Sequence, residues 1–420
     1  MQFGFKNAVS THQPIFLLKE LINKYVKEKS PLYIASLDAE KAYDSVWRDG
    51  IFFKIKDSIN KQFWLVMKDY YDKADGVFKI NNNIDNENIV KILRGVKQGG
   101  VLSPQLFNFY VDELIRMVQE TGEGCRIEDL ILAILAYCDD MLLVAPSITQ
   151  MNKMIGKCEE FGNKWLIKFN AKKSVILNGG EKLFKNEQIK VLMGQSEMPV
   201  VEISKYLGIN IDTIHSDDEQ TLKRFKKVQS CFYGLGSYGL KPPGLKPKIK
   251  SFIYNTYCQP MGTYAFGLMT INKQTIQKLN IMQNNLIRYT LGIPYKTHIK
   301  LLLKCLNIID VETVYLINKC TSIKLLHRDV TTKTILTKNI NENNENWWFF
   351  KEIKQICELV NVSPKYLCDY PDKVREKILE KYFYDLTEDE LEKCIQIEKR
   401  LINYSFIDKK ELVNLIKLQY

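Results

Sequence analysis

The chain has 420 residues, of which 45% are hydrophobic, a proportion that excludes a largely disordered protein and suits two or three globular domains. Its 60 Lys and Arg against 49 Asp and Glu leave a formal net charge of +11. Such a charge suits a polyanionic partner, but taken alone it favours a basic protein without one.

The cysteines are typical of a reduced protein. All ten are scattered, with no C-x-x-C pair and no closely spaced Cys/His set of the kind that binds zinc. The first residues contain no apolar signal region, and no stretch reaches the roughly 18 apolar residues that span a bilayer. We therefore expect an intracellular protein with no membrane partner.

The first elements are a helix and a buried strand. Ser10 and Gln13 form a capping-box pattern ahead of apolar residues at helical spacing over 15–25. The short apolar run 32–38 predicts a strand covered on both faces, with Asp38 at its end.

A hairpin and a helix follow. Two alternating segments between Val77 and Val96 flank an Asn-rich stretch at 81–86, which predicts a hairpin with a polar loop. Ser103 and the proline after it predict a helix start, and one apolar face then continues to Gly122.

The next segments carry two adjacent carboxylates. Asp139 and Asp140 interrupt the apolar run 135–144, and apolar spacing predicts a helix over 151–165. Short strand-like segments then lie at 166–169, 175–177, 189–193 and 200–203.

The rest of the chain reads as helical. Ser216 with Glu219, and later Thr387 with Glu390, form capping-box patterns at helix starts. We expect only helices beyond Ser216.

Asp38, Asp139 and Asp140 form the main candidate site. Burying unpaired carboxylates is costly, so carboxylates within apolar segments favour a compensating cation. If neighbouring strands bring the three together, their oxygen ligands suit Mg²⁺ or Mn²⁺. An isolated Asp-Asp pair more often forms an exposed turn, but the apolar residues on both sides argue against that interpretation.

Five blocks in a fixed order resemble the reverse transcriptase domain of non-LTR (LINE-type) retrotransposons. They occupy 37–46 (LDAEKAYDSV), 95–104 with the following FN pair (GVKQGGVLSP), 136–140 (AYCDD), 170–174 (NAKKS) and 206–208 (YLG). Each block is short, but their order over 37–208 makes the resemblance specific.

The resemblance implies an α+β fold with a right-hand polymerase palm, an antiparallel sheet with helices, followed by a helical thumb and a helical C-terminal extension. It divides the chain into a residual fingers segment at 1–29, a palm with the catalytic motifs at 30–212, a thumb at 213–300 and the extension at 301–420. We expect an N-terminally truncated domain that lacks most of the fingers, the endonuclease and the Cys/His knuckle of relatives.

The resemblance also implies the metal ligands. Asp38 and Asp139 match the principal ligands of two Mg²⁺ ions, with Mn²⁺ as a substitute. Asp140 matches the second carboxylate of the pair, and the Ala39 carbonyl joins the metal shell. Lys173 matches the lysine that protonates the departing pyrophosphate, although an ordinary surface lysine is the alternative.

Further positions match the substrate contacts of the family. Tyr43 matches the aromatic residue that excludes a 2′-hydroxyl, and its alternative is a core tyrosine. Gln98 and Gly99 match the loop that contacts the nucleotide and template. The turn that grips the primer end in the family is matched by Tyr206, Leu207 and Gly208.

The implied activity is RNA-directed DNA polymerisation, with an RNA template, a DNA primer and deoxynucleoside triphosphates as partners, and the family favours the nucleus over the cytoplasm. Basic residues at 223–227 and 241–250 suit phosphate contacts or plain solvated faces. Two alternative functions remain: a catalytically impaired nucleic-acid-binding relic and a maturase-like RNA-binding protein.

Overall fold

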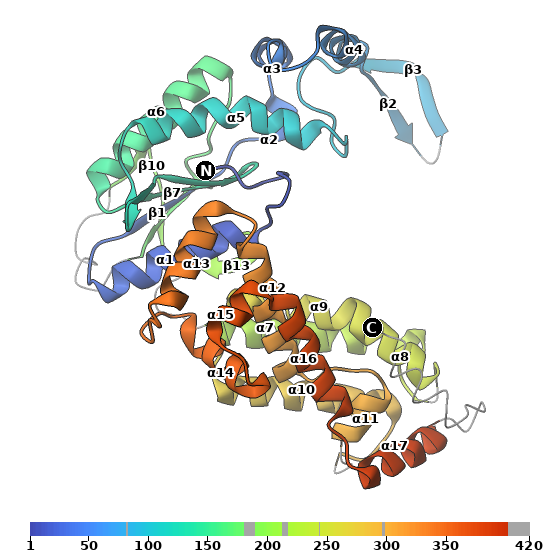
Figure 1. Cartoon of the computed structure of the whole chain (residues 1–420). Helices are drawn as coiled ribbons and strands as arrows, with labels where there is room; N and C mark the ends of the chain where they lie inside the picture. Colours follow the sequence, from blue (N-terminus) through green and yellow to red (C-terminus); the bar gives the residue numbers. More distant parts are fainter. Residues whose placement is uncertain (81–82, 180–189, 212–216, 243, 296–298, 402–420) are drawn as a thin grey trace. The chain divides into compact units, whose positions relative to one another are not determined.

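The computed structural model describes residues 1–80, 83–179, 190–211, 217–242, 244–295 and 299–401. The chain forms two compact units, Met1–Thr213 and Ile214–Tyr420 (Figure 1). Among the described residues, no helix has the length and apolar character needed to cross a membrane.

The first unit is built on a five-stranded sheet in the order β11-β8-β1-β7-β6. Its strands are β1 (Tyr33–Leu37), β6 (Ile134–Tyr137), β7 (Asp140–Ala145), β8 (Val175–Asn178) and β11 (Val200–Val201). The pairings of β8 with β1, β1 with β7, and β7 with β6 are antiparallel, and only the pair of β11 with β8 is parallel. The α+β palm expected from the sequence is confirmed, with this one parallel pair added.

Helices cover both faces of the sheet, as the unbroken apolar runs of its strands predict. Tyr33, Ala35 and Leu37 share a core with helices α5 (Ser103–Glu120) and α6 (Ile148–Trp165). Ile34, between them in β1, is equally buried and faces the other way. Helix α1 (His12–Lys27) contacts β6, on the face opposite to α5 and α6 (Figure 1).

The remaining elements of this unit are smaller. The helices are α2 (Ala42–Ser45), α3 (Arg48–Ile55) and α4 (Lys61–Asp72). The paired short strands are β2 (Asp75–Ile80) with β3 (Asn83–Lys91), β4 (Cys125–Ile127) with β5 (Leu130–Leu132), β9 (Leu192–Met193) with β10 (Ser196–Glu197), and β12 (Ser204–Tyr206) with β13 (Ile209–Ile211). The predicted hairpin is therefore present as β2 and β3, although most of the Asn-rich stretch belongs to β3.

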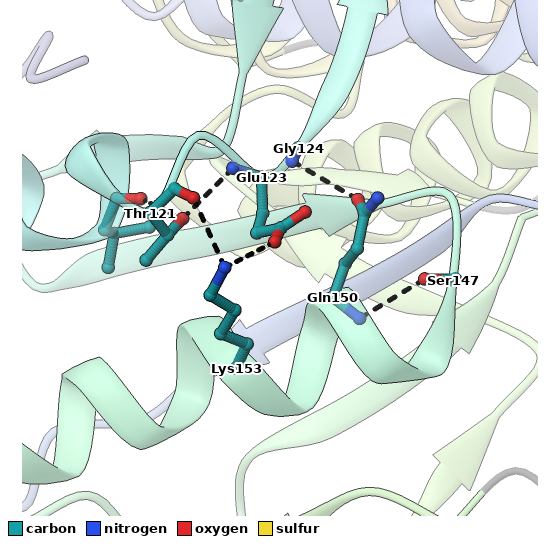
Figure 2. A network of polar contacts seen from close by, with 7 residues as sticks. Thr121, Glu123, Gly124, Ser147, Gln150 and Lys153 are labelled. Atoms are coloured by element: carbon teal, nitrogen blue, oxygen red, sulfur yellow. Dashed lines mark hydrogen bonds and ion pairs between the residues drawn. The ribbon is translucent and has the colours of Figure 1, made fainter.

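A polar network joins the end of α5 to the start of α6 (Figure 2). Lys153 Nζ lies 2.7 Å from Glu123 Oε1 and 3.5 Å from the carbonyl oxygen of Thr121. Gly124 N–H donates to Gln150 Oε1 at 3.5 Å. These contacts fix the approach to β4 from the two helices that cover the sheet.

Three strand predictions fail wholly or in part. Of the segment 200–203, only Val200 and Val201 form a strand, β11. The apolar segment 166–169 is not a strand, because Leu166 takes a left-handed conformation with φ 58° and ends α6, while Ile167 N–H donates to the Gly162 carbonyl. Phe169 keeps only an isolated bridge to Ala39. Of the segment 189–193, only the last two residues form a strand, and its first residue lies outside the described ranges.

Every regular element described in the second unit is helical, which confirms the prediction for the chain beyond Ser216, a residue that itself lies outside the described ranges. The longer helices are α7 (Asp217–Gly234), α10 (Lys273–Leu291), α12 (Val311–Leu326), α13 (Val330–Asn341), α14 (Phe350–Val360), α16 (Pro371–Tyr384) and α17 (Glu388–Leu401). The shorter ones are α8 (Pro247–Ile253), α9 (Gln259–Gly262), α11 (Lys300–Cys305) and α15 (Pro364–Asp369), with 3₁₀ turns η2 (Leu235–Tyr238) and η4 (Phe266–Leu268) and the π-helical η3 (Tyr254–Cys258).

Capping fixes several of these helix starts. Asn272 and Asp310 each accept a hydrogen bond from the backbone N–H three residues later. Thr387 and Glu390 exchange the two reciprocal bonds of the predicted capping box, both at 3.2 Å.

Lys250 corrects one interpretation of the basic clusters. Its side chain is buried, and Nζ donates to the Thr290 carbonyl at 2.7 Å. It therefore ties α8 to α10 and is not available for phosphate contact.

Candidate active site

Asp38 and Asp140 meet at the end of the central strand pair. The register of β1 and β7 places Leu37 opposite Met141. The same register, extended by one residue, puts Asp38 opposite Asp140, with both side chains on the face away from α5 and α6. Two carboxylates separated by about a hundred residues of chain thus lie side by side at one end of the sheet, where β1 ends and β7 begins.

Asp139 lies in the tight loop between β6 and β7. Tyr137 pairs with Asp140, which leaves Cys138 and Asp139 as the two loop residues. Both aspartates of the pair are exposed, whereas Cys138 is buried and has φ 56°. The pair thus lies at an exposed turn, the interpretation that the flanking apolar residues had argued against, because those residues are buried in β6 and β7 on either side of it. The turn presents the Asp139 carboxylate to solvent and directs the cysteine inward.

Negative charge at this edge is uncompensated. Partial desolvation raises the pKa of Asp140, and the neighbouring carboxylates Asp139 and Asp38 raise it further. Within the described ranges, no Lys or Arg forms an ion pair with any of the three. The site therefore favours a cation.

The carboxylates do not form a closed cage. In the part of the chain that the structure describes, no three His, Cys, Asp or Glu side chains converge closely enough to hold a metal ion by themselves. Mg²⁺ is commonly held by one or two carboxylates together with waters and substrate phosphates. An open set of oxygen donors at a strand end fits that mode of binding.

The Ala39 carbonyl is oriented toward the same place. Glu40 N–H donates to the Lys168 carbonyl, and Asn170 N–H donates to the Asp38 carbonyl, both at 2.8 Å. In this antiparallel pattern the N–H and C=O of Ala39, the residue between, point away from the 168–170 segment. Because β7 flanks β1 on the other side, the Ala39 oxygen faces the loop that carries Asp139.

Tyr43 is half-buried beside this loop. Its ring stacks on Phe107 of α5. Burial raises the pKa of the Tyr43 hydroxyl, and the contact with Cys138 and the charge of Asp139 raise it further. The ring is thus fixed at one edge of the site, next to the turn.

The block at 95–104 is anchored to the segment that carries Tyr43. Val96 N–H donates to the Tyr43 carbonyl at 2.9 Å. The buried Arg48 guanidinium bonds the carbonyl oxygens of Gly95 at 3.0 Å and Tyr71 at 2.7 Å, and also that of Ile92.

Gln98 and Gly99, the two residues expected to contact the nucleotide and template, follow the anchored residues Gly95 and Val96 in the chain. Gln98 Nε2 donates to Asp44 Oδ1 at 3.0 Å, and Gly99 has φ 75° with open space around it. Both are exposed.

Lys173 lies in a loop shaped by Asn170. The Asn170 side chain accepts from the N–H groups of Lys172 and Lys173, and Ser174 Oγ accepts from Asp38 N–H at 3.0 Å. The Lys173 side chain is exposed. The Ser174 hydroxyl and the Asn170 N–H therefore hold this loop against the backbone of Asp38.

The turn at 206–208 joins β12 to β13. Leu207 has φ 45° and Gly208 φ 79°, the two positive values of a type I′ hairpin turn. Tyr206 is buried, and its hydroxyl lies 3.4 Å from the carbonyl oxygen of Leu135 in β6. Burial raises the pKa of Tyr206, and the negative charge of Asp140 raises it further.

Gln2 and Asn108 contact the carboxylate loop, and the sequence assigned neither of them a role. Gln2 Oε1 accepts from Cys138 N–H at 3.1 Å, and Asn108 Oδ1 accepts from the Cys138 thiol at 3.4 Å. Asn108 belongs to the FN pair of the second block, and this was the only feature of the sequence that could have indicated a role for it. No sequence pattern indicated a role for Gln2.

The model of the family described as "Reverse transcriptase (RNA-dependent DNA polymerase)" matches residues 1–211, half of the chain. The chain belongs to the reverse transcriptase family. This confirms the family to which the five blocks pointed. Members of this family depend on divalent metal ions, in keeping with the open carboxylate edge.

Retrotransposon reverse transcriptases are among the similar proteins. The probable RNA-directed DNA polymerase from transposon BS of Drosophila melanogaster is 23% identical over 74% of this chain and 34% of its own length. The Pol polyprotein from the type-2 retrotransposable element R2DM of the same fly is 31% identical over 62% and 24%. The chain thus spans about a quarter to a third of these relatives.

Among solved structures, telomerase from Candida tropicalis in complex with a fragment of telomeric RNA has a TM-score of 0.39 and 13% identity, covering 96% of this chain and 53% of that one.

Proposed function

We propose that the chain catalyses RNA-directed DNA synthesis as the polymerase portion of a non-LTR retrotransposon reverse transcriptase. The single observation that carries this proposal is the meeting of Asp38 with the Asp139–Asp140 loop at one sheet edge, within a chain of this family. The substrates are a DNA primer, an RNA template and deoxynucleoside triphosphates, and the nucleus is the place of action.

Asp38, Asp139, Asp140 and the Ala39 carbonyl would hold two Mg²⁺ ions, or Mn²⁺ in their place. When bound, such ions lower the pKa of an attacking hydroxyl and stabilise the leaving oxygen. The primer 3′-hydroxyl loses its proton to water, and its oxygen forms a bond to the α-phosphorus of the nucleotide. The bond from that phosphorus to pyrophosphate breaks, and Lys173 donates a proton to the pyrophosphate.

The other residues position the substrates. The Tyr43 ring lies under the incoming sugar and excludes a 2′-hydroxyl, and Gln98 and Gly99 contact the nucleotide and template. Tyr206, Leu207 and Gly208 hold the primer end. In the second unit, the exposed Lys226 and Lys227 contact phosphates without reading sequence.

Primer extension on a homopolymer RNA template, with Mg²⁺ or Mn²⁺, tests this proposal. We expect the chain to incorporate deoxynucleotides and Asp139→Asn to reduce incorporation by at least about 100-fold. Asp57→Asn removes an exposed carboxylate elsewhere in the first unit and serves as the control. Absence of incorporation, or incorporation unaltered by Asp139→Asn, contradicts the polymerase assignment; duplex binding without extension supports the relic.

A further inference from the structure

Cys138 adopts a backbone conformation that L-residues seldom keep. Its φ of 56° lies in the left-handed region, which is strained for a non-glycine residue. Such a conformation persists only where neighbouring groups determine it. Because Asp139 is the next residue, whatever holds Cys138 also sets the direction in which Asp139 points.

Gln2 holds the backbone of Cys138. Its Oε1 accepts from Cys138 N–H at 3.1 Å and from Gly4 N–H at 2.9 Å. The Gln2 side chain is itself fixed, because it is only 7% exposed and its backbone bridges Ala136 in β6. The acceptor is therefore rigidly aimed at the loop.

The amide nitrogen of Gln2 also indicates that the side chain is placed for its Oε1. Its Nε2 is buried and has no hydrogen-bond partner among the described residues. A buried donor without a partner destabilises the folded state, because the donor loses its hydrogen bond to water. The two hydrogen bonds that Gln2 Oε1 accepts, from Cys138 N–H and Gly4 N–H, offset this cost.

Asn108 holds the side chain of Cys138 from helix α5. Its Oδ1 accepts from the thiol at 3.4 Å, and its Nδ2 donates to the Gly4 carbonyl at 2.6 Å. A Cβ on Gly4 would lie 2.7 Å from Cys138 N, so only glycine permits this approach. Two segments far apart in sequence, residues 2–4 and helix α5, therefore converge on one loop residue.

We propose that Gln2 and Asn108 are positioning residues, which hold Cys138 in its left-handed conformation and thereby fix the Asp139 carboxylate for metal binding. For catalysis, this inference rests on the proposed polymerase function. For metal binding, it stands on the geometry of the loop alone. Placement matters because a displacement of about 1 Å at a reacting centre can cost about 100-fold in rate.

The test replaces Gln2 by methionine in the full chain, which keeps the shape and removes the acceptor. Mn²⁺ binding is measured by electron paramagnetic resonance, and primer extension is measured alongside it. We expect Gln2→Met to weaken Mn²⁺ binding about 3- to 10-fold and to lower kcat about 10- to 100-fold. Asn108→Leu, which also removes a buried amide, is expected to do the same and carries the test if Gln2→Met does not fold.

Gln13→Met is the matched control. Gln13 is also buried in the first unit, but its Oε1 accepts from Ser10 N–H at the start of α1. We expect this variant to leave Mn²⁺ binding and kcat unchanged. An equal loss in Gln13→Met would show a general effect of losing a buried amide and would overturn the inference.

A second substitution separates positioning from stability. Glycine adopts positive φ without strain, so Cys138→Gly in the Gln2→Met background should restore at least half of the lost Mn²⁺ affinity. The Tm of each variant is measured separately, so that a change in stability can be distinguished from a change in Mn²⁺ binding. Unchanged Mn²⁺ binding in a folded Gln2→Met, or no rescue by Cys138→Gly, overturns the inference. If the wild-type chain binds Mn²⁺ at Asp139 but extends no primer, the polymerase function fails and the positioning role remains.

Discussion

The rings of Tyr43 and Phe107 lie 5.0 Å apart between centroids, with their planes inclined by only 16°. This stacking fixes the Tyr43 ring from α5, a helix that is itself packed in the core. A ring held in this way resists displacement by a substrate with an extra hydroxyl, as a steric gate requires.

Tyr43→Val is therefore expected to lower the preference for deoxynucleotides over ribonucleotides by about 10- to 100-fold, measured as the ratio of kcat/KM values. Tyr43→Phe keeps the ring and its stacking and should keep the preference. A ratio that does not change in Tyr43→Val would show that Tyr43 is only a core residue.

Asp140→Asn should stabilise the metal-free protein at neutral pH. The folded state raises the pKa of Asp140, so folding disfavours its charged form. That penalty is complete above the folded-state pKa and vanishes below the unfolded-state value. We expect the Tm of Asp140→Asn to rise by about 1–3 °C near pH 7, a small value because the group is exposed, and by less at about pH 4. Asp57→Asn should show no such gain, and a gain that grows as the pH falls would contradict the sign.

Arg48→Met should destabilise the first unit. The substitution leaves the carbonyl oxygens of Gly95, Tyr71 and Ile92 without this donor, and the first two of these bonds are buried. We expect a loss of about 3 kcal/mol in the free energy of unfolding, measured with urea. Arg116→Met, which removes an exposed arginine paired with Asp112, should cost less than about 0.5 kcal/mol. Equal losses in the two variants would contradict the assigned role.

Gly95 and Gly99 provide a matched pair of substitutions. Both have positive φ, but a Cβ on Gly95 would lie 2.9 Å from Asp44 backbone atoms, whereas one on Gly99 would meet open space. Gly95→Ala should therefore cost about 2–4 kcal/mol and Gly99→Ala about 1 kcal/mol in unfolding experiments. A larger loss for Gly99→Ala would refute the steric argument.

Lys173→Ala tests the proposed proton donor. The side chain is exposed, so the substitution should leave Tm unchanged while it lowers kcat about 100- to 1,000-fold. Lys172→Ala, in the adjacent and equally exposed position, is the control and should lose less than about threefold. If both variants behave alike, Lys173 is an ordinary surface lysine.

Local patterns were sufficient to predict the strands of the main sheet and a few helices, but not α2, α3 and α4 between residues 42 and 72. Apolar spacing located α5 and α6, and the capping box at Thr387 located the start of α17. The segment 166–169 was mistaken for a strand because its apolar residues do not reveal that Leu166 takes a left-handed conformation as a helix cap. Backbone conformation at a single residue leaves no periodic signal.

Long-range contacts were beyond such patterns. The sequence indicated that Asp38 and Asp139 end apolar runs, but the order of strands that joins them depends on pairing between distant segments. The contact of Gln2 with Cys138 spans 136 positions, and one glutamine in an irregular segment carries no hydropathy signal. The five blocks located the carboxylates that we propose bind metal, whereas the contacts of Gln2 and Asn108 with Cys138 are visible only in the structure.

The central place of β1 in the sheet has a consequence for synthesis of the chain. β1 ends at Leu37, but its partner β7 begins about a hundred residues later and β8 later still. At about 5–20 residues per second, the ribosome takes roughly 5–20 s to make the intervening segment. During that time β1 exposes two apolar faces and two unpaired edges, so the nascent palm depends on α1 or on a chaperone for protection until both partner strands emerge.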